Sequence, residues 1–119
     1  MQTDWLFRMP TLHLAEAQAK GGGRAYLYEL AWQSPGNGGA LGACHGLDGP
    51  LLFGTYDAHE PAGHRPGATA GARDLTSQIR TAWTSFATSG DPGWPAYDSR
   101  QRLTRIFDTP PSVTPCARP

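Results

Sequence analysis

Long apolar runs are missing from this sequence of 119 residues. Nowhere do eighteen apolar residues follow one another, and the start, MQTDWLF, has neither a basic region nor the apolar stretch of a secretory signal. A membrane-spanning helix and a cleaved signal are therefore not expected. Read from Met1 as the start, the sequence predicts a soluble, cytoplasmic protein with no membrane partner.

An excess of one charge and a set of cysteines are also missing. Ten Lys and Arg balance ten Asp and Glu, so no net field attracts nucleic acid or an anionic surface. The two cysteines, Cys44 and Cys116, are too few for a disulfide framework. These counts argue against a nucleic-acid partner and a disulfide scaffold, and they favour a reducing compartment.

The length allows one modest domain with a thin core. Fifteen glycines and eleven prolines predict long loops between few regular elements. We expect the domain to cover residues 1–109 and the proline-rich segment 110–119 to be loose.

The first predicted element is a helix that starts at Trp5 behind a cap at Thr3 or Asp4. Pro10 should kink or restart it, because proline has no N–H group and its ring strikes the preceding turn. Gly21–Gly23 should end it. Four residues at helical spacing predict its buried face: Leu6, Met9, His13 and Ala17. His13 is therefore expected to be a partly buried histidine with a hydrogen-bond partner.

Two strands and a second helix are predicted further along. Residues 24–32, RAYLYELAW, have apolar side chains at both parities, which is typical of a central strand covered on both faces. A helix from Asp74, closed by Gly90, carries one apolar stripe. The stripe comprises Leu75, Ile79, Ala82, Trp83 and Phe86. Trp94 and Tyr97 should pack the following turn, and residues 102–108 alternate like an edge strand.

The predicted strands are too few to form a complete sheet. A strand covered on both faces needs neighbours on both sides, and only one further strand is predicted. The chain alone therefore predicts an incomplete α/β fold, whose exposed edge could associate with itself or with another segment.

Two further site hypotheses meet only part of what each kind of site requires. The glycine loop 36–42, GNGGALG, resembles a phosphate-binding turn, but such a site needs a helix to open there, and the glycines and prolines up to Pro50 leave no room for one. Cys44, His45, His59 and His64 could form a tetrahedral metal site, yet the usual paired spacings are half absent. We expect neither a metal nor an organic cofactor, and a small metal-binding protein stays an alternative.

His45 lies in a setting suited to a general base. It follows a predicted strand in GACHGLDGPLLFG, and the glycines around it allow a turn that exposes one imidazole nitrogen. Imidazole titrates near pH ~6.5, so it can take and return a proton. A loop histidine bonded to the backbone is the alternative.

Six segments together resemble one family. TDWLFRMP, LAEAQA, YLYEL.W, LGACHGLDGPLLFG, AWTSFATSGDP and WPAYD occur, over residues 3–108, in the order seen at the C-terminal end of the carboxylesterase type B family. The resemblance implies an α/β-hydrolase fold, of which this chain supplies the terminal strands and packing helices. It also implies that His45 is the base of a Ser-His-acid triad that hydrolyses carboxylic esters.

The chain lacks two parts of the family pattern, the serine nucleophile and the acidic member of the triad. No serine lies in the G-x-S-x-G frame of the family's nucleophile. The acidic triad member also lies outside the chain, and Asp48 follows His45 too closely to replace it. In addition, Asp48-Gly49-Pro50 stands where relatives commonly have Glu-Leu-Pro. The resemblance thus implies a chain that is inactive alone and acts on a small ester only with an N-terminal complementing segment. A non-catalytic hydrolase remnant, serving as an interaction module, is the alternative.

Overall fold

A computed structural model describes residues 4–33, 47–56 and 69–116 of the chain. The chain divides into two compact units. The first comprises residues 1–29, 94–105 and 113–119, and the second comprises residues 30–93 and 106–112. Among the described residues, no helix is both long and apolar enough to cross a membrane.

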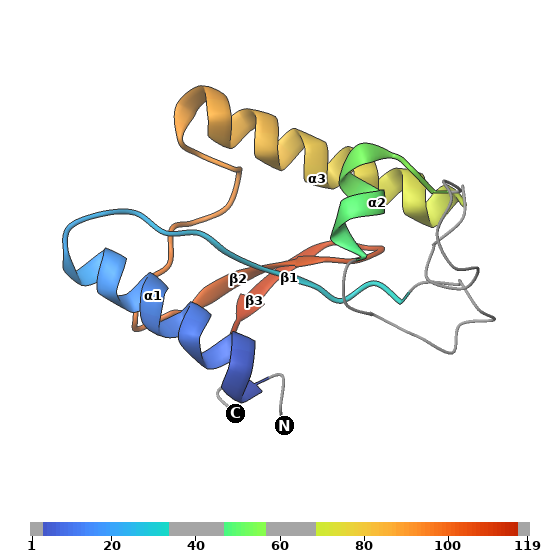
Figure 1. Cartoon of the computed structure of the whole chain (residues 1–119). Coiled ribbons are helices and arrows are strands. Elements are labelled where there is room, and N and C mark those ends of the chain that lie inside the picture. Colours follow the sequence, from blue (N-terminus) through green and yellow to red (C-terminus); the bar gives the residue numbers. More distant parts are fainter. Residues whose placement is uncertain (1–3, 34–46, 57–68, 117–119) are drawn as a thin grey trace. The chain divides into compact units, whose positions relative to one another are not determined.

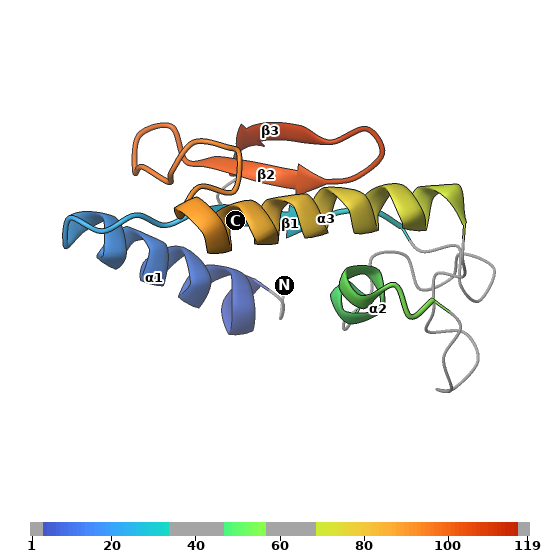
Figure 2. The same ribbon diagram turned by 90° about the horizontal axis from the view of Figure 1, so that it is seen from above.

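The described sheet has three strands in the order β1-β2-β3. They are β1 (Leu27–Leu30), β2 (Leu103–Phe107) and β3 (Ser112–Pro115). The N–H groups of Ala31 and Trp32 donate to the carbonyl oxygen of Phe107 at 3.1 and 3.3 Å. The C-terminal ends of β1 and β2 therefore meet, and these strands are parallel. Figure 2 shows that β2 and β3 point in opposite directions, as in a hairpin.

Two strand predictions need correction. Segment 24–32 is a strand only over β1, which pairs with β2 alone in the described sheet, and Tyr28 is 46% exposed. Residues 102–108 were expected at an edge, but β2 lies in the middle. The reason is β3, which lies in the proline-rich segment expected to be loose. Its residues are exposed, and an edge strand tolerates proline because its outer N–H groups need no ladder partner.

The first helical segment restarts at the predicted place. A short π-helix, η1 (Asp4–Arg8), passes into α1 (Met9–Lys20), with Pro10 in the first turn of α1. First-turn N–H groups have no intrahelical partner, so proline costs no hydrogen bond there. The N–H of Gly21 donates to the carbonyl oxygen of Ala17 at 3.0 Å and ends the helix, as predicted.

The predicted buried face of this helix is largely wrong, although Met9 is partly buried and packs against the core. Leu12 and Ala15 are buried, whereas Leu6 is 65% exposed and His13 is exposed. The π-helical turn changes the angular phase between residues 6 and 9, and the partners decide which face is covered. The core cluster of this unit consists of Leu12, Ala15, Leu27 and Tyr97.

The turn after residue 93 packs as its aromatic residues predict. Trp94 and Tyr97 are 7% and 3% exposed, and the rings of Tyr26 and Trp94 meet edge to face at 6.3 Å. The hydroxyl of Tyr97 donates to Glu16 Oε1 at 3.2 Å. Burial raises the pKa of Tyr97 above its ordinary value, because an apolar setting disfavours the phenolate.

The long helix α3 (Ala70–Ser89) starts four residues before the predicted Asp74. Thr69 caps it, since its hydroxyl oxygen accepts from the N–H of Ala72 at 3.1 Å. Gly90 ends it as predicted, with φ +74°. The early start is possible because Gly71 lies against the buried indole of Trp32, where a Cβ would come within 3.2 Å of the ring.

The buried stripe of α3 is largely the predicted one. It consists of Ala72, Leu75, Thr76, Ile79 and Ala82. The ring of Trp83 lies 6.0 Å from that of the buried Phe107 on β2, which confirms helix-to-sheet packing at this position. Phe86 is 52% exposed. The stripe therefore includes one residue, Thr76, whose side chain is polar.

Candidate functional site

The predicted base falls outside the described residues. His45 and Cys44 lie in segment 34–46 together with the glycine loop 36–42, and His59 and His64 lie in segment 57–68. Their roles stay predictions. His13, the only histidine in the described part of the chain, is exposed on α1. Nowhere in residues 4–33, 47–56 and 69–116 do three His, Cys, Asp or Glu residues gather as they would around a metal ion.

A short helix follows His45 in the sequence. Leu47 is 1% exposed, and α2 (Asp48–Phe53) begins at the next residue. The glycines and prolines up to Pro50 predict no helix before Leu51, and this prediction is wrong because α2 begins at Asp48. Pro50 is in the first turn, where its missing N–H group costs nothing. Gly49 has no Cβ to clash with the ring of the following proline.

Helix α2 lies beside the N-terminal half of α3, as both views show (Figures 1 and 2). Its last carbonyl groups have no partner within the helix, because an α-helix leaves its final four carbonyls unbonded. The N–H groups of Gly54 and Thr55 reach the first of them, on Pro50. Side chains of α3 reach the next two, so α3 completes the C-terminus of α2.

Thr76 supplies the first of these side-chain bonds. Its hydroxyl donates to the carbonyl oxygen of Leu51 at 2.5 Å. The hydroxyl of Tyr56 donates to Thr76 Oγ1 at 2.7 Å. Each hydroxyl in this chain of bonds donates once, and linked bonds of this kind polarise and strengthen one another. Because Thr76 is 6% exposed and Leu51 is fully buried, little water competes for these groups.

Arg80 supplies the second side-chain bond, one turn further along α3. Its Nε donates to the carbonyl oxygen of Leu52 at 2.8 Å. Gly54 ends α2 in the left-handed region, with φ +70°. A Cβ at Gly54 would lie 3.1 Å from Arg80 Nη2. The backbone conformation therefore favours glycine at this position, and a Cβ would crowd the end of the Arg80 side chain.

Replacing Gly54 by alanine should destabilise the chain. The left-handed conformation costs about 1–2 kcal/mol for a residue with a Cβ, and displacement of Arg80 adds the loss of a hydrogen bond, about 1 kcal/mol. The control is Gly22→Ala, because Gly22 has φ +83° with no atom within 4 Å of a Cβ. Urea unfolding should show a larger loss for Gly54→Ala than for Gly22→Ala, and equal losses would contradict the contact with Arg80.

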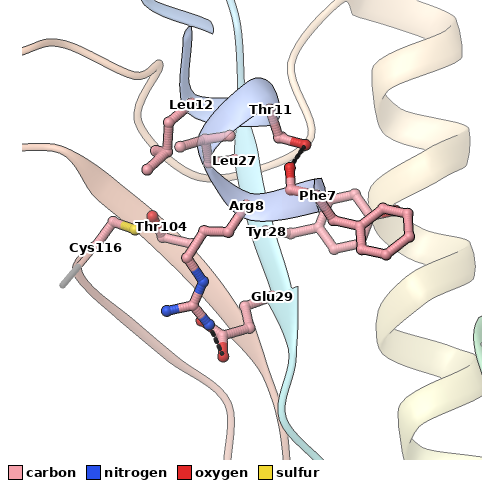
Figure 3. A pocket seen from close by; sticks show the side chains of 9 residues that line it. All are labelled: Phe7, Arg8, Thr11, Leu12, Leu27, Tyr28, Glu29, Thr104 and Cys116. Atoms are coloured by element: carbon pink, nitrogen blue, oxygen red, sulfur yellow. Dashed lines mark hydrogen bonds and ion pairs between the residues drawn. The ribbon is translucent and has the colours of Figure 1, made fainter. Parts of the chain in front are cut away.

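A separate pocket of about 210 Å³ lies in the first unit (Figure 3). Nine residues line it: Phe7, Arg8, Thr11, Leu12, Leu27, Tyr28, Glu29, Thr104 and Cys116. Arg8 Nη2 donates to Glu29 Oε1 at 3.3 Å in a partly exposed ion pair. Pairs this exposed contribute little to stability. The nine described residues that line it include the hydroxyls of Thr11 and Thr104 and the thiol of Cys116.

Sequence reasoning missed the residues that hold α2. A signal was available for Thr76, because it occupies a position of the apolar stripe of α3, next to Leu75 and three residues before Ile79. A threonine there must hydrogen-bond its hydroxyl when buried. No comparable signal exists for Tyr56 or Arg80, whose partners are twenty and twenty-eight residues away.

Comparison with known proteins points to one family. The family model described as the carboxylesterase family matches residues 1–112. The chain is 32% identical over 114 residues to the para-nitrobenzyl esterase of Bacillus subtilis (strain 168), covering 92% of this chain and 23% of that protein. It is 30% identical over 106 residues to a probable N-octanoylanthranilate hydrolase of Rhodococcus erythropolis, covering 86% of this chain and 23% of the relative.

Solved structures give the same fold. A carboxylesterase of Geobacillus stearothermophilus is similar with a TM-score of 0.75 and 28% identity, covering 94% of this chain and 24% of that one. A PNB esterase is similar with a TM-score of 0.76 and 30% identity, covering 95% and 23%. The chain therefore has the fold of a segment of an α/β-hydrolase and spans about a quarter of the relatives it matches.

Proposed function

Because this chain belongs to the carboxylesterase family, we propose that it is the C-terminal part of a serine carboxylesterase and supplies the base, His45. In the complete active site His45 takes the proton of the serine hydroxyl as that oxygen attacks the ester carbonyl carbon. It then returns the proton to the leaving alcohol. In the second half, His45 takes a proton from the water that attacks the acyl-enzyme, and the acid is released.

One observation carries this proposal. The histidine of the family motif GACHGLDGPLLFG lies two residues before the buried Leu47 and three before α2. In α2, Leu51 is buried, and the carbonyl oxygens of Leu51 and Leu52 accept hydrogen bonds from α3. A general base must be held within hydrogen-bond reach of the proton it takes. A helix that is bonded to α3 and begins three residues after His45 supports such a role.

The partner that we propose is the stretch of polypeptide that carries the serine nucleophile and the acidic triad member. Neither occurs in the family frame within these 119 residues. The substrate class is a small carboxylic ester, as the family implies, and no metal or organic cofactor takes part. The acyl and alcohol pockets would come largely from the proposed partner segment.

The chain by itself should be inactive, because a base without a nucleophile forms no acyl-enzyme. We expect the purified 119-residue chain to hydrolyse p-nitrophenyl acetate no faster than free imidazole at equal concentration. A fluorophosphonate probe should leave its serines unlabelled. Stoichiometric labelling of a serine would contradict the proposal.

Activity should return when the missing part is supplied. In a chimaeric esterase, this chain replaces the matched quarter of the Bacillus subtilis para-nitrobenzyl esterase. The chimaera should hydrolyse p-nitrophenyl acetate and react with the probe at its serine nucleophile. A chimaera that melts cooperatively and yet stays inactive would overturn the proposal.

That last outcome would favour the second candidate function, a non-catalytic remnant that serves as an interaction module. The observation in its favour is a set of exposed apolar side chains on η1 and α1. Leu6, Phe7 and Leu14 are 65%, 60% and 72% exposed. Apolar side chains of this size on a surface favour association with a partner or with a second copy.

A further inference from the structure

Thr76 is one of two polar residues buried in the described part of the chain. It occupies the apolar stripe of α3, where alanine or valine would pack without any hydrogen-bonding requirement. Burying a hydroxyl is unfavourable unless it is bonded. Thr76 Oγ1 meets that requirement twice, through the carbonyl oxygen of Leu51 and the hydroxyl of Tyr56.

The helix to which Thr76 is bonded cannot hold its own position. Helix α2 has six residues, and isolated helices shorter than about 12 residues are marginal in water. Its N-cap residue, Leu47, makes no side-chain capping bond. Its place is therefore set by burial of Leu47 and Leu51 and by the bonds from Thr76 and Arg80 to its carbonyl groups.

We propose that Thr76 is a positioning residue for the base: its hydroxyl fixes α2, and α2 begins three residues after His45. This inference rests on the proposed function. The hydroxyl fixes the rotation of α2 about its axis as well as its distance from α3, because a hydrogen bond is directional and apolar packing is not. Tyr56, by donating to Thr76 Oγ1, keeps the threonine proton directed at Leu51.

The test uses the chimaeric esterase described above and the substitution Thr76→Val, which keeps the shape of the side chain and removes the hydroxyl. We expect kcat for p-nitrophenyl acetate to fall roughly 10- to 100-fold, because a displacement of about 1 Å in a catalytic group costs up to 10²-fold. KM should stay within about twofold by the same reasoning, since the substrate pocket is untouched. Thr76→Ser keeps the hydroxyl and should restore most of the rate.

The matched control is Thr88→Val on the same helix. Thr88 is exposed, and its hydroxyl donates only to the carbonyl oxygen of Thr84 in its own helix, at 2.8 Å. It should leave kcat unchanged. Equal losses for Thr76→Val and Thr76→Ser would contradict the role of the hydroxyl.

A double substitution separates positioning from simple loss of folding. If Thr76 acts through the base, adding Thr76→Val to His45→Gln does not lower kcat further, once kcat is corrected for the folded fraction. If it lowers the residual rate equally in both backgrounds, its role is structural and the proposal falls. Should His45→Gln itself leave kcat unchanged, the proposed function fails. If His45→Gln lowers kcat and Thr76→Val does not, the proposed function stands and the positioning role of Thr76 is contradicted.

A measurement on the 119-residue chain itself is independent of the chimaera. Hydrogen exchange is measured at the backbone amides of Leu51, Gly54 and Thr55, which donate to the carbonyl oxygens of Leu47 and Pro50. Thr76→Val should raise their exchange rates roughly tenfold over Thr88→Val, because the hydrogen bond that opposes local opening of α2 is lost. Unchanged rates would show that the hydroxyl does not hold α2.

Discussion

Replacing His45 by glutamine in the chimaeric esterase should lower kcat for p-nitrophenyl acetate by roughly 10⁴-fold or more, because loss of a triad base removes nearly all of the nucleophile's reactivity. Glutamine is similar in size to histidine and can donate a hydrogen bond, but it cannot accept a proton near neutral pH. The measurement is steady-state hydrolysis together with the rate of labelling by a fluorophosphonate probe. Both should fall together.

The control for this substitution is His13→Gln. His13 is exposed on α1 in the first unit, and the same chemical change there should leave kcat within about twofold, as is usual for a surface position outside a site. Added imidazole should partly restore activity to His45→Ala, since it supplies the missing base. A loss smaller than about tenfold for His45→Gln would be too small for a triad base and would remove His45 from the mechanism.

Replacing Leu51 by alanine should have the largest effect on stability. Its side chain is fully buried in α2, and Leu→Ala at such a site costs about 2–5 kcal/mol through lost apolar burial and the cavity left behind. The same residue carries the carbonyl to which Thr76 donates, so displacement of α2 would also weaken that bond. Urea unfolding, followed by tryptophan fluorescence, measures the change.

Leu14→Ala is the matched control for Leu51→Ala. Leu14 is 72% exposed on α1, so the same atoms are removed without opening a cavity, and the free energy of unfolding should change by no more than about 0.5 kcal/mol. Similar losses for both substitutions would mean that α2 does not pack as described. A variant at Leu51 too unstable to measure agrees with the expected direction.

Local signals predicted several elements well. The apolar stripe and Gly90 predicted α3 and its end, and Pro10 predicted the restart at α1. Trp94 and Tyr97 predicted the packed turn. Such features depend on side chains within a few residues of one another, which is why the sequence alone is sufficient for them.

The order of strands could not be predicted in the same way. Segment 24–32 looked central and is an edge of the described sheet, and β2 looked like an edge and is in the middle. The second error came from β3, whose prolines predicted a loose segment. The first came from the apolar residues at both parities of segment 24–32, which do not by themselves supply a second neighbouring strand. Strand pairing depends on residues far apart in the sequence, and an edge strand accepts residues that a central one cannot.

The amino-acid sequence by itself indicated the α/β class and, through the resemblance of its ordered segments, the family, which the family model matches. That resemblance also supplied His45 as the proposed base. Only the tertiary structure decided what holds the segment after that base. Thr76 and Arg80 meet the carbonyl oxygens of Leu51 and Leu52 across more than twenty residues of chain. A helix of six residues lacks the local hydrogen bonds to fix its own place, so its position is a property of the packed molecule.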